Sequence, residues 1–236
     1  MDGLTLLLII IGALVGIVVL ITIISFLAWR SRKEEKTTSY TDQIGNLGEE
    51  EINGILLDIQ KLRGGEVYNN LILEDKYKNY TEIDNIYVSI YGVFIIETKA
   101  WSGTIKGTKD DEKWTEILGN NNIFHSKENP FIQNERHIKF FKRVIHPRCE
   151  ITPIVTFIAH KLESIQCRDV VLSCDLRKYL LSFEDKTVEQ SEYEYIVRRL
   201  NAFKDNPPMT HEEYKKNSQR KIQKQQKYDN IPITFD

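Results

Sequence analysis

The sequence lacks paired cysteines, clustered histidines and an excess of positive charge, and each absence excludes a class of protein. Three cysteines without a CxxC pair make neither a disulfide framework nor a cysteine zinc site, so we expect a reducing compartment. The five histidines form no HxxxH or HExxH pair, which excludes the usual histidine zinc motifs. With 32 basic and 34 acidic residues, the net charge of −2 is unlike that of a nucleic-acid coat protein. A locally basic groove is compatible with that balance.

The sequence also contains no P-loop, no dinucleotide-binding glycine fingerprint and no nucleophile elbow. What it does contain is enough apolar side chain for a core, since 41% of its 236 residues are hydrophobic. This length normally makes one domain, or one domain with appendages.

Residues 4–29 form an apolar run without a charged side chain. A bilayer core needs roughly 20 helical residues, so this run predicts one transmembrane helix that anchors the chain in a lipid bilayer. A signal peptide would start with basic residues, and a buried core helix would be shorter. The positive charges directly follow the run, at Arg30, Arg32, Lys33 and Lys36. The positive-inside rule therefore predicts a single-pass protein of the cell membrane, with its N-terminus outside and the remaining chain cytoplasmic.

Three further segments follow the predicted anchor, 1–29. Residues 30–41 resemble a polar linker, residues 42–205 a single α/β domain, and residues 206–236 a basic polar tail. Within the domain, apolar periodicity predicts helices over 49–62, 130–145 and 189–203. Strands are expected over 67–73, 83–89, 93–96, 153–159 and 169–172, with a turn at 101–103 leading into another strand.

The tail combines a helix start with a run of positive charge. Thr210 and Glu213 have the spacing of a capping box, which predicts a polar helix from this point. Six basic residues without an acid follow, at Lys215, Lys216, Arg220, Lys221, Lys224 and Lys227. They could contact phosphates or anionic lipid headgroups, or they could form a solvated tail.

An acidic residue two positions before a lysine occurs six times, beginning at Glu34, Glu74, Glu97, Asp111, Glu184 and Glu213. Such a tripeptide is weak by itself, but Glu97-Thr98-Lys99 ends a fully apolar strand, where charges are costly unless they are paired or bind a metal. Strand geometry puts Glu97 and Lys99 on the same face. A turn containing Gly92 joins this strand to the preceding one, so a hairpin can bring Asp84 beside Glu97.

Two carboxylates and an amine are what metal-assisted phosphodiester hydrolysis requires. Carboxylate oxygens hold Mg²⁺, which stabilises charge on the phosphate and activates a bound water. An amine beside that water orients it and neutralises the transition state. The alternative is an ordinary ion pair between a carboxylate and a lysine at the end of a strand.

Several ordered blocks closely resemble the nuclease-related domain (NERD) family. They are GNLGE at 45–49, IDNIYVS at 83–89, YGVFIIETK at 91–99, WSG at 101–103 and NPFIQN at 129–134, followed by His137. The resemblance covers about 42–144 and extends toward 181. This family is placed in the PD-(D/E)XK restriction-endonuclease-like superfamily. The resemblance implies an α-β-β-β-α-β core, a mixed sheet flanked by helices, and Mg²⁺-dependent cleavage of nucleic acid, with Mn²⁺ as a substitute.

The same resemblance assigns roles to five residues. Asp84 and Glu97 are expected to be the metal ligands, and Lys99 the group that positions the attacking water. Glu49 matches an acidic residue on the first helix, and Gln133 a polar position that contacts substrate or metal; a helix-surface amide is its alternative. The chain departs from the family pattern after the aspartate, where Asn85 stands in place of a frequent histidine.

We therefore expect a membrane-anchored Mg²⁺-dependent nuclease that acts on DNA. The alternative from a different class is a membrane-tethered module that retains the fold but binds nucleic acid, or serves as an adaptor, without cleaving anything. Trp101, Trp114 and the tyrosines could stack on bases, or pack in the core. Nothing in the sequence indicates a protein partner.

Overall fold

The computed structural model describes residues 3–229 except 102, 120–122, 160, 164 and 166, and only the backbone of residues 3–15, 31–44, 46 and 224–229. The contacts within the chain divide it into two units, Met1–Leu47 and Gly48–Asp236, which are described separately. Helix α1 (Gly3–Arg63) contributes to both.

The N-terminal unit is helical and exposes apolar side chains. In its described part, large hydrophobic residues such as Ile17, Phe26 and Trp29 are each more than half exposed. Among the described residues, no helix combines the length and the apolar character that crossing a membrane requires. The side chains of residues 4–15, which belong to the predicted membrane span, lie outside the described residues, as do those of 31–41 in the predicted linker.

The larger unit is built on a mixed five-stranded sheet in the order β1-β2-β3-β7-β9. Strands β1 (Glu66–Glu74), β2 (Tyr80–Ser89) and β3 (Gly92–Lys99) form an antiparallel meander. Strands β7 (Ile151–Phe157) and β9 (Val170–Leu172) continue the sheet in parallel with β3. Seven of the eight residues of β3 are buried, as expected for a central strand covered on both faces.

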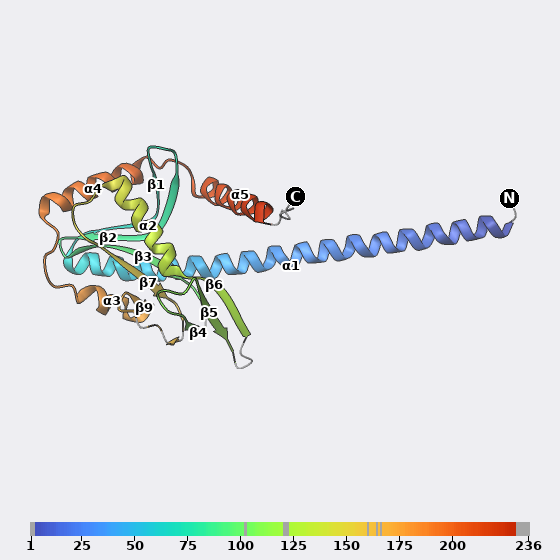
Figure 1. Ribbon diagram of the computed structural model, residues 1–236, viewed down its shortest axis with the longest axis horizontal. Coiled ribbons are helices and arrows are strands. Elements are labelled where there is room, and N and C mark those ends of the chain that lie inside the picture. The colour runs from blue at the N-terminus through green and yellow to red at the C-terminus, as the bar shows by residue number, and fades with distance from the viewer. Residues whose placement is uncertain are drawn as a thin grey trace, which may run out of the picture. The chain divides into compact units, whose positions relative to one another are not determined.

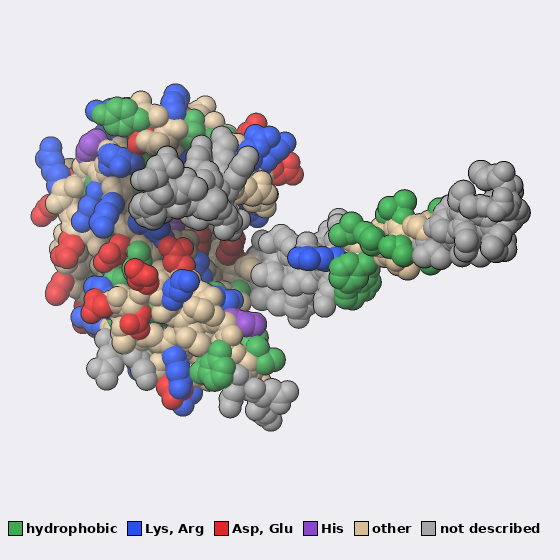
Figure 2. Space-filling model, turned by 45° about the vertical axis from the view of Figure 1, so that its right-hand side comes forward, with side chains coloured by type: hydrophobic (Ala, Val, Ile, Leu, Met, Phe, Trp, Pro, Cys, Tyr) green, Lys and Arg blue, Asp and Glu red, His purple; other side chains and the backbone are tan. Residues whose placement is uncertain are grey.

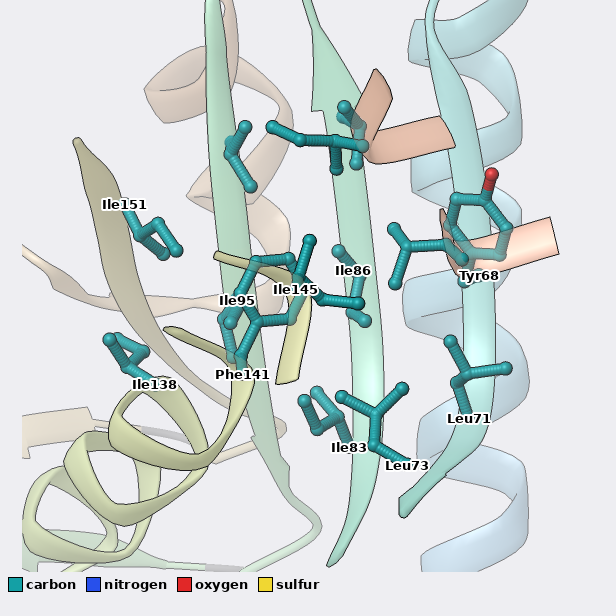
Figure 3. Packing of buried hydrophobic residues seen from close by; sticks show 14 of the residues in the cluster. Tyr68, Leu71, Leu73, Ile83, Ile86, Ile95, Ile138, Phe141, Ile145 and Ile151 are labelled. Carbon is teal, nitrogen blue, oxygen red and sulfur yellow. The ribbon is translucent and has the colours of Figure 1, made fainter. Parts of the chain in front are cut away.

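Helices cover both faces of this sheet (Figure 1). On one face, the last turns of α1 and helix α3 (Ser173–Leu181) pack against β2, β3 and β7. On the other face lie α2 (Pro130–Ile145) and α4 (Gln190–Asp205). Figure 3 shows Phe141 and Ile145 of α2 beside Ile95 of the sheet, and Ile138 near Ile151. Apart from three strands of a second sheet that are inserted between β3 and α2, the order α1, β1, β2, β3, α2, β7 is the α-β-β-β-α-β order that the sequence resemblance implied.

A second mixed sheet of four strands has the order β6-β5-β4-β8. It consists of β4 (Thr104–Lys106), β5 (Lys113–Leu118), β6 (Ile123–Glu128) and β8 (Lys161–Glu163). Its apolar side packs into a cluster that contains Trp101, Trp114 and Phe157. Trp114 is fully buried and Trp101 is 9% exposed, so both tryptophans pack in the core instead of offering a surface for stacking bases.

The predicted polar helix of the tail is confirmed as α5 (His211–Asp229). Its capping box is formed: the Glu213 carboxylate accepts hydrogen bonds from the Thr210 backbone N–H at 2.9 Å and from the Thr210 hydroxyl at 3.0 Å. The Glu213 N–H donates in return to the Thr210 hydroxyl oxygen at 3.2 Å. The side chains of Lys224 and Lys227 lie outside the described residues.

The NPFIQN block sets the position of α2. Asn129 is the N-cap, since its Oδ1 accepts from the Phe131 N–H at 2.9 Å, and Pro130 occupies the first turn, where no N–H is needed. The buried Asn134 then donates from Nδ2 to the carbonyls of Ile95, at 2.9 Å, and Ile154, at 2.8 Å. One amide group therefore ties α2 to two neighbouring strands of the sheet.

Pro153 lies inside β7 although proline cannot donate to a sheet. The Val155 N–H points toward the β9 side, where it donates to the Asp169 carbonyl at 2.9 Å. Backbone N–H groups two residues apart in a strand point to the same side, so position 153 also faces the β9 side. Strand β9 does not extend that far, because its first paired residue, Val170, lies opposite Val155. The missing N–H of Pro153 therefore removes no ladder bond.

The Asn134 bridge predicts a stability effect that can be separated from surface effects. Asn134→Ala removes two buried hydrogen bonds and should lower the free energy of unfolding by about 2 kcal/mol, at about 1 kcal/mol for each bond. Asn217→Ala on the exposed surface of α5 is the matched control and should stay within about 0.5 kcal/mol of wild type. Urea unfolding of the purified chain measures both. Equal effects of the two variants would show that the bridge does not hold the helix to the sheet.

Candidate active site

The β2–β3 hairpin brings the two predicted carboxylates together. Asn85 pairs with Ile96, and extending this register by one residue sets Asp84 opposite Glu97. The Thr98 N–H donates to Asp84 Oδ2 at 2.9 Å, which fixes the aspartate against the neighbouring strand. The structure thus shows the juxtaposition that the hairpin prediction requires.

Asp84 lies at an irregular point of the sheet. The β1–β2 ladder pairs residues on either side of Asp84 and Asn70 but does not pair these two, and Asn70 has a left-handed backbone with φ of 49°. Tyr68 and Leu71 are three residues apart yet pack in the same cluster, whereas regular alternation would put them on opposite faces. Both strands therefore change face here, and Asp84 occupies the crossover.

A contiguous polar group forms around Glu97 on the α2 side of the sheet. The Lys99 ammonium lies 2.5 Å from Glu97 Oε1 and donates to Gln133 Oε1 at 3.0 Å. The Glu97 side chain is 1% exposed, whereas that of Lys99 is 19% exposed. Because a carboxylate this deeply buried needs a partner, the ion pair makes the position of Glu97 tolerable. The ammonium remains accessible from solvent.

His137 completes this group one helical turn after Gln133. Its Nε2 lies 3.4 Å from Glu97 Oε2 and 3.5 Å from Gln133 Nε2, and its Nδ1 lies 2.8 Å from the Thr81 hydroxyl. In the neutral tautomer with Nε2 protonated, the imidazole donates to Glu97 and accepts from the Thr81 hydroxyl. His137 thereby holds the second oxygen of the carboxylate that Lys99 holds by its first.

The electrostatics distinguish the two carboxylates. Burial and the adjacent Glu97 carboxylate raise the pKa of Asp84 well above its usual range. Burial alone would also raise the pKa of Glu97, but Lys99 and His137 together outweigh it, so this pKa is lowered. Burial likewise acts to lower the pKa of Lys99, yet Glu97 and Asp84 overcome it and raise that pKa. Lys99 therefore compensates Glu97, and the charge of Asp84 stays poorly compensated.

Glu49 lies on α1, further from this centre than the other predicted residues. Its Oε2 accepts from Asn70 Nδ2 at 3.0 Å, and its charge adds to the repulsion on Asp84. Gly48 allows the helix to come this close: a Cβ there would lie 2.6 Å from Ile158 Cδ1 and 3.1 Å from Ala100 Cβ. The structure therefore associates Glu49 with Asn70, at the crossover, and not with the Glu97–Lys99 pair.

The carboxylate pair fits a magnesium ion. Carboxylate oxygens are the donors that Mg²⁺ prefers, and a divalent cation would relieve the repulsion that raises the pKa of Asp84. Each oxygen of Glu97 has a second lone pair beyond its contact with Lys99 or His137. In the described part of the chain, no cluster of three or more His, Cys, Asp or Glu side chains is arranged to hold a metal. Two carboxylate ligands would leave room for the waters that Mg²⁺ usually retains.

Comparison with known proteins identifies this part of the chain. Residues 44–158 match the family model described as the nuclease-related domain. This segment contains all the site residues described above: Glu49, Thr81, Asp84, Glu97, Lys99, Gln133 and His137. This segment therefore belongs to the nuclease-related domain family, as the sequence blocks indicated. The match begins in α1 and ends just after β7.

A curated relative is an uncharacterized protein of Bacillus anthracis. It is 29% identical over 149 residues, which cover 57% of this chain and 65% of the relative. The chain thus spans a little under two thirds of the length of that protein. No solved structure matches the chain significantly.

Sequence reasoning named His137 in the family resemblance without giving it a role, and it missed Thr81. The five histidines were considered scattered, yet His137 stands four positions after Gln133 on a predicted helix, so the two share a helix face. That spacing was a usable signal for His137, whereas nothing in the sequence pointed to Thr81. Asn85, where the family often has histidine, is 1% exposed and donates to the Thr98 hydroxyl at 3.2 Å, so it supports the strand from inside.

The charge of Asp84 predicts a variant that is more stable without metal. The pKa of Asp84 is higher in the fold than in the unfolded chain, so the folded state loses stability as pH rises above the ordinary aspartate range. Asn cannot ionise, but its Oδ1 can still accept from Thr98. At pH 7.5 in EDTA, Asp84→Asn should therefore melt at a higher temperature than wild type, by about 2–4 °C for each kcal/mol gained.

The pH and the metal provide the controls in a calorimetric melt. The difference between Asp84→Asn and wild type should shrink as the pH falls toward 4, because the aspartate of the unfolded chain then begins to be protonated as well. Mg²⁺ should raise the melting temperature of wild type and leave that of the variant unchanged. A variant less stable than wild type at both pH values would contradict the assigned repulsion.

Proposed function

We propose that this protein is a Mg²⁺-dependent nuclease that hydrolyses phosphodiester bonds, with DNA as its substrate. The observation that carries the proposal is the group of Asp84, Glu97, Lys99 and Gln133, which join around one carboxylate pair inside a nuclease-related domain. The mixed sheet flanked by helices agrees with the restriction-endonuclease-like core that the resemblance implied.

Asp84 and Glu97 would hold the metal in this proposal. When bound there, Mg²⁺ supplies stabilisation of the charge on the phosphoryl oxygens and a bound water of lowered pKa. The protein's own part is to hold the two carboxylates at adjacent positions and to keep Glu97 ionised through its contacts with Lys99 and His137. The positive charge of the metal would favour the ionised form of Asp84. The hydrogen bond from the Thr98 backbone N–H holds the Asp84 carboxylate beside Glu97.

Lys99 would orient the attacking water and neutralise the transition state. Its raised pKa keeps it protonated at neutral pH, so it acts as a hydrogen-bond donor and a positive charge, not as a base. Gln133 accepts from the ammonium and limits its motion, and His137 limits that of Glu97. We therefore propose that Gln133 and His137 position the reacting groups and that Lys99 stabilises the transition state.

The nuclease proposal is tested with the purified full chain and plasmid DNA. Cleavage should require Mg²⁺ and cease in EDTA. Glu97→Gln and Lys99→Met should each lower the rate by about 100-fold or more, since each removes a charge at the reacting phosphate. His137→Leu should lower the rate about tenfold and weaken Mg²⁺ binding in calorimetry. Both carboxylate ligands remain in this variant, but Glu97 loses the contact that holds its second oxygen.

The matched control uses another of the six acidic-x-lysine tripeptides. Glu184 and Lys186 have the spacing of Glu97 and Lys99 but are exposed and outside the site, so Glu184→Gln/Lys186→Gln should cleave like wild type. If the chain binds DNA but neither cleaves it nor binds Mg²⁺, it is instead the non-catalytic nucleic-acid-binding module.

We further propose that residues 4–29 anchor the domain in the cell membrane, with the domain on the cytoplasmic side. The uncharged length of this run supports a span, and so do the apolar side chains that the described part of its helix exposes. The basic residues at 30–36 support the orientation.

Membrane fractions provide the test of the anchor. The full chain should sediment with membranes and resist alkaline carbonate, whereas Ile17→Lys/Leu20→Lys should be extracted, because charges in the centre of a span are costly. A C-terminal fluorescent reporter should be protected from external protease. Carbonate extraction of the wild-type chain would falsify the anchor and leave the nuclease proposal untouched.

A further inference from the structure

A pocket, distinct from the candidate active site, lies at the C-terminal end of α2. It has a volume of about 400 Å³ and lies between the β1–β2 turn, the end of α2 and helix α4. Its cationic lining residues are Lys76 from the turn, Arg143 from α2 and Arg199 from α4. Pockets of this size hold ligands of nucleotide size.

The acidic side chains of this pocket are already engaged with partners. Asp75 is 6% exposed, and its carboxylate accepts from the backbone N–H groups of Tyr77 at 2.8 Å and Asn79 at 3.0 Å. It also lies 3.0 Å from the Arg143 guanidinium, which it orients toward the pocket. Glu74 is paired with Lys78 at 2.9 Å. The anchored Asp75 thus serves to hold a guanidinium in place.

The end of α2, which would repel an anion, is neutralised. The last carbonyls of a helix carry partial negative charge. Here the Arg199 guanidinium donates to the Val144 carbonyl at 2.8 Å, and the Tyr195 hydroxyl to the Ile145 carbonyl at 2.9 Å. The His146 N–H donates to Lys142 at 3.1 Å. The remaining donors of Arg199 and the Lys76 ammonium therefore face the pocket as positive charge, which favours a phosphate ligand.

Helix α2 contacts β2 and the turn before it, and these contacts run from the active site to the pocket. At the active-site end Thr81 of β2 contacts His137, and at the pocket end Asp75 contacts Arg143. From His137 to Arg143 the helix rises about 9 Å, at about 1.5 Å per residue. Each strand of a nucleic-acid duplex advances about 3.4 Å along the duplex axis per nucleotide, so the pocket lies about three nucleotides from His137 at the active site.

We propose that this pocket binds a backbone phosphate of the substrate strand, about three nucleotides from the cleaved bond. The proposal rests on the proposed nuclease function, because it takes the substrate to be a nucleic acid. It also explains how a chain with a net charge of −2 can hold a polyanion. Figure 2 shows basic and acidic side chains interspersed on one face of the molecule, so binding depends on local sites of this kind and not on an overall positive surface.

The test measures oligonucleotide binding by the full chain carrying Asp84→Asn, without metal, through fluorescence anisotropy. Labelled duplex oligonucleotides of increasing length should gain affinity in a step once they span about three base pairs beyond the site. Lys76→Gln should remove this step, weaken binding about fivefold and lower the salt slope by about 0.9, the value for one phosphate contact on B-DNA. Arg199→Gln should act in the same direction, with a thermal melt to show that it is folded.

The matched control removes two exposed cations from the opposite face of the sheet. Arg177→Gln/Lys178→Gln on α3 should change neither the step nor the salt slope. Inorganic phosphate, titrated as a competitor, distinguishes a strand phosphate from a free anion. The proposal is overturned if Lys76→Gln matches the control, or if phosphate binds the pocket while oligonucleotide affinity is independent of length. Because no cleavage is measured, these outcomes stay separate from loss of Mg²⁺-dependent activity.

Discussion

The buried carboxylate of Glu97 is the constraint on which the rest of the larger unit depends. It sits at the end of a strand that is covered on both faces, where an unpaired charge would be severely destabilising. Its partners come from the same strand, through Lys99, and from α2, through His137. Docking of α2 is therefore a condition for burying Glu97, and the Asn134 bridge that fixes α2 on the sheet also fixes the site. Stability and site geometry share the same contacts.

Sequence patterns predicted the central part of the fold well because each pattern had one physical cause. Helix α2 was predicted with its observed bounds, since Asn129 caps it and Pro130 can only begin it. Strand β3 was predicted from its apolar run, which few structures other than a buried strand accommodate. The second sheet was mostly missed. Its strands are short, and β6 is largely exposed, so no alternation of apolar and polar residues distinguishes them from loops.

The candidate site was predictable where it depended on local geometry and not where it depended on packing. The neighbouring positions of Asp84 and Glu97 follow from the hairpin register, and the shared face of Glu97 and Lys99 from strand alternation. The contact between Lys99 and Gln133 depends on the angle of α2, which no sequence spacing encodes; the family resemblance pointed to Gln133 but not to this contact. The crossover of the strands at Asp84 was hidden because both strands change face together.

Gly48 has a consequence for how the chain can change in evolution. Its missing side chain lets α1 approach Ala100 and Ile158 closely, which pins the helix at one point along its axis. Residues added or lost before this point leave the phase of Glu49 unchanged. A single deletion between Gly48 and Ile52 would instead turn the preceding part of the helix by about 100° relative to the buried Ile52 and Leu56. Variation in length is therefore expected on the N-terminal side of this glycine, while the spacing after it stays fixed.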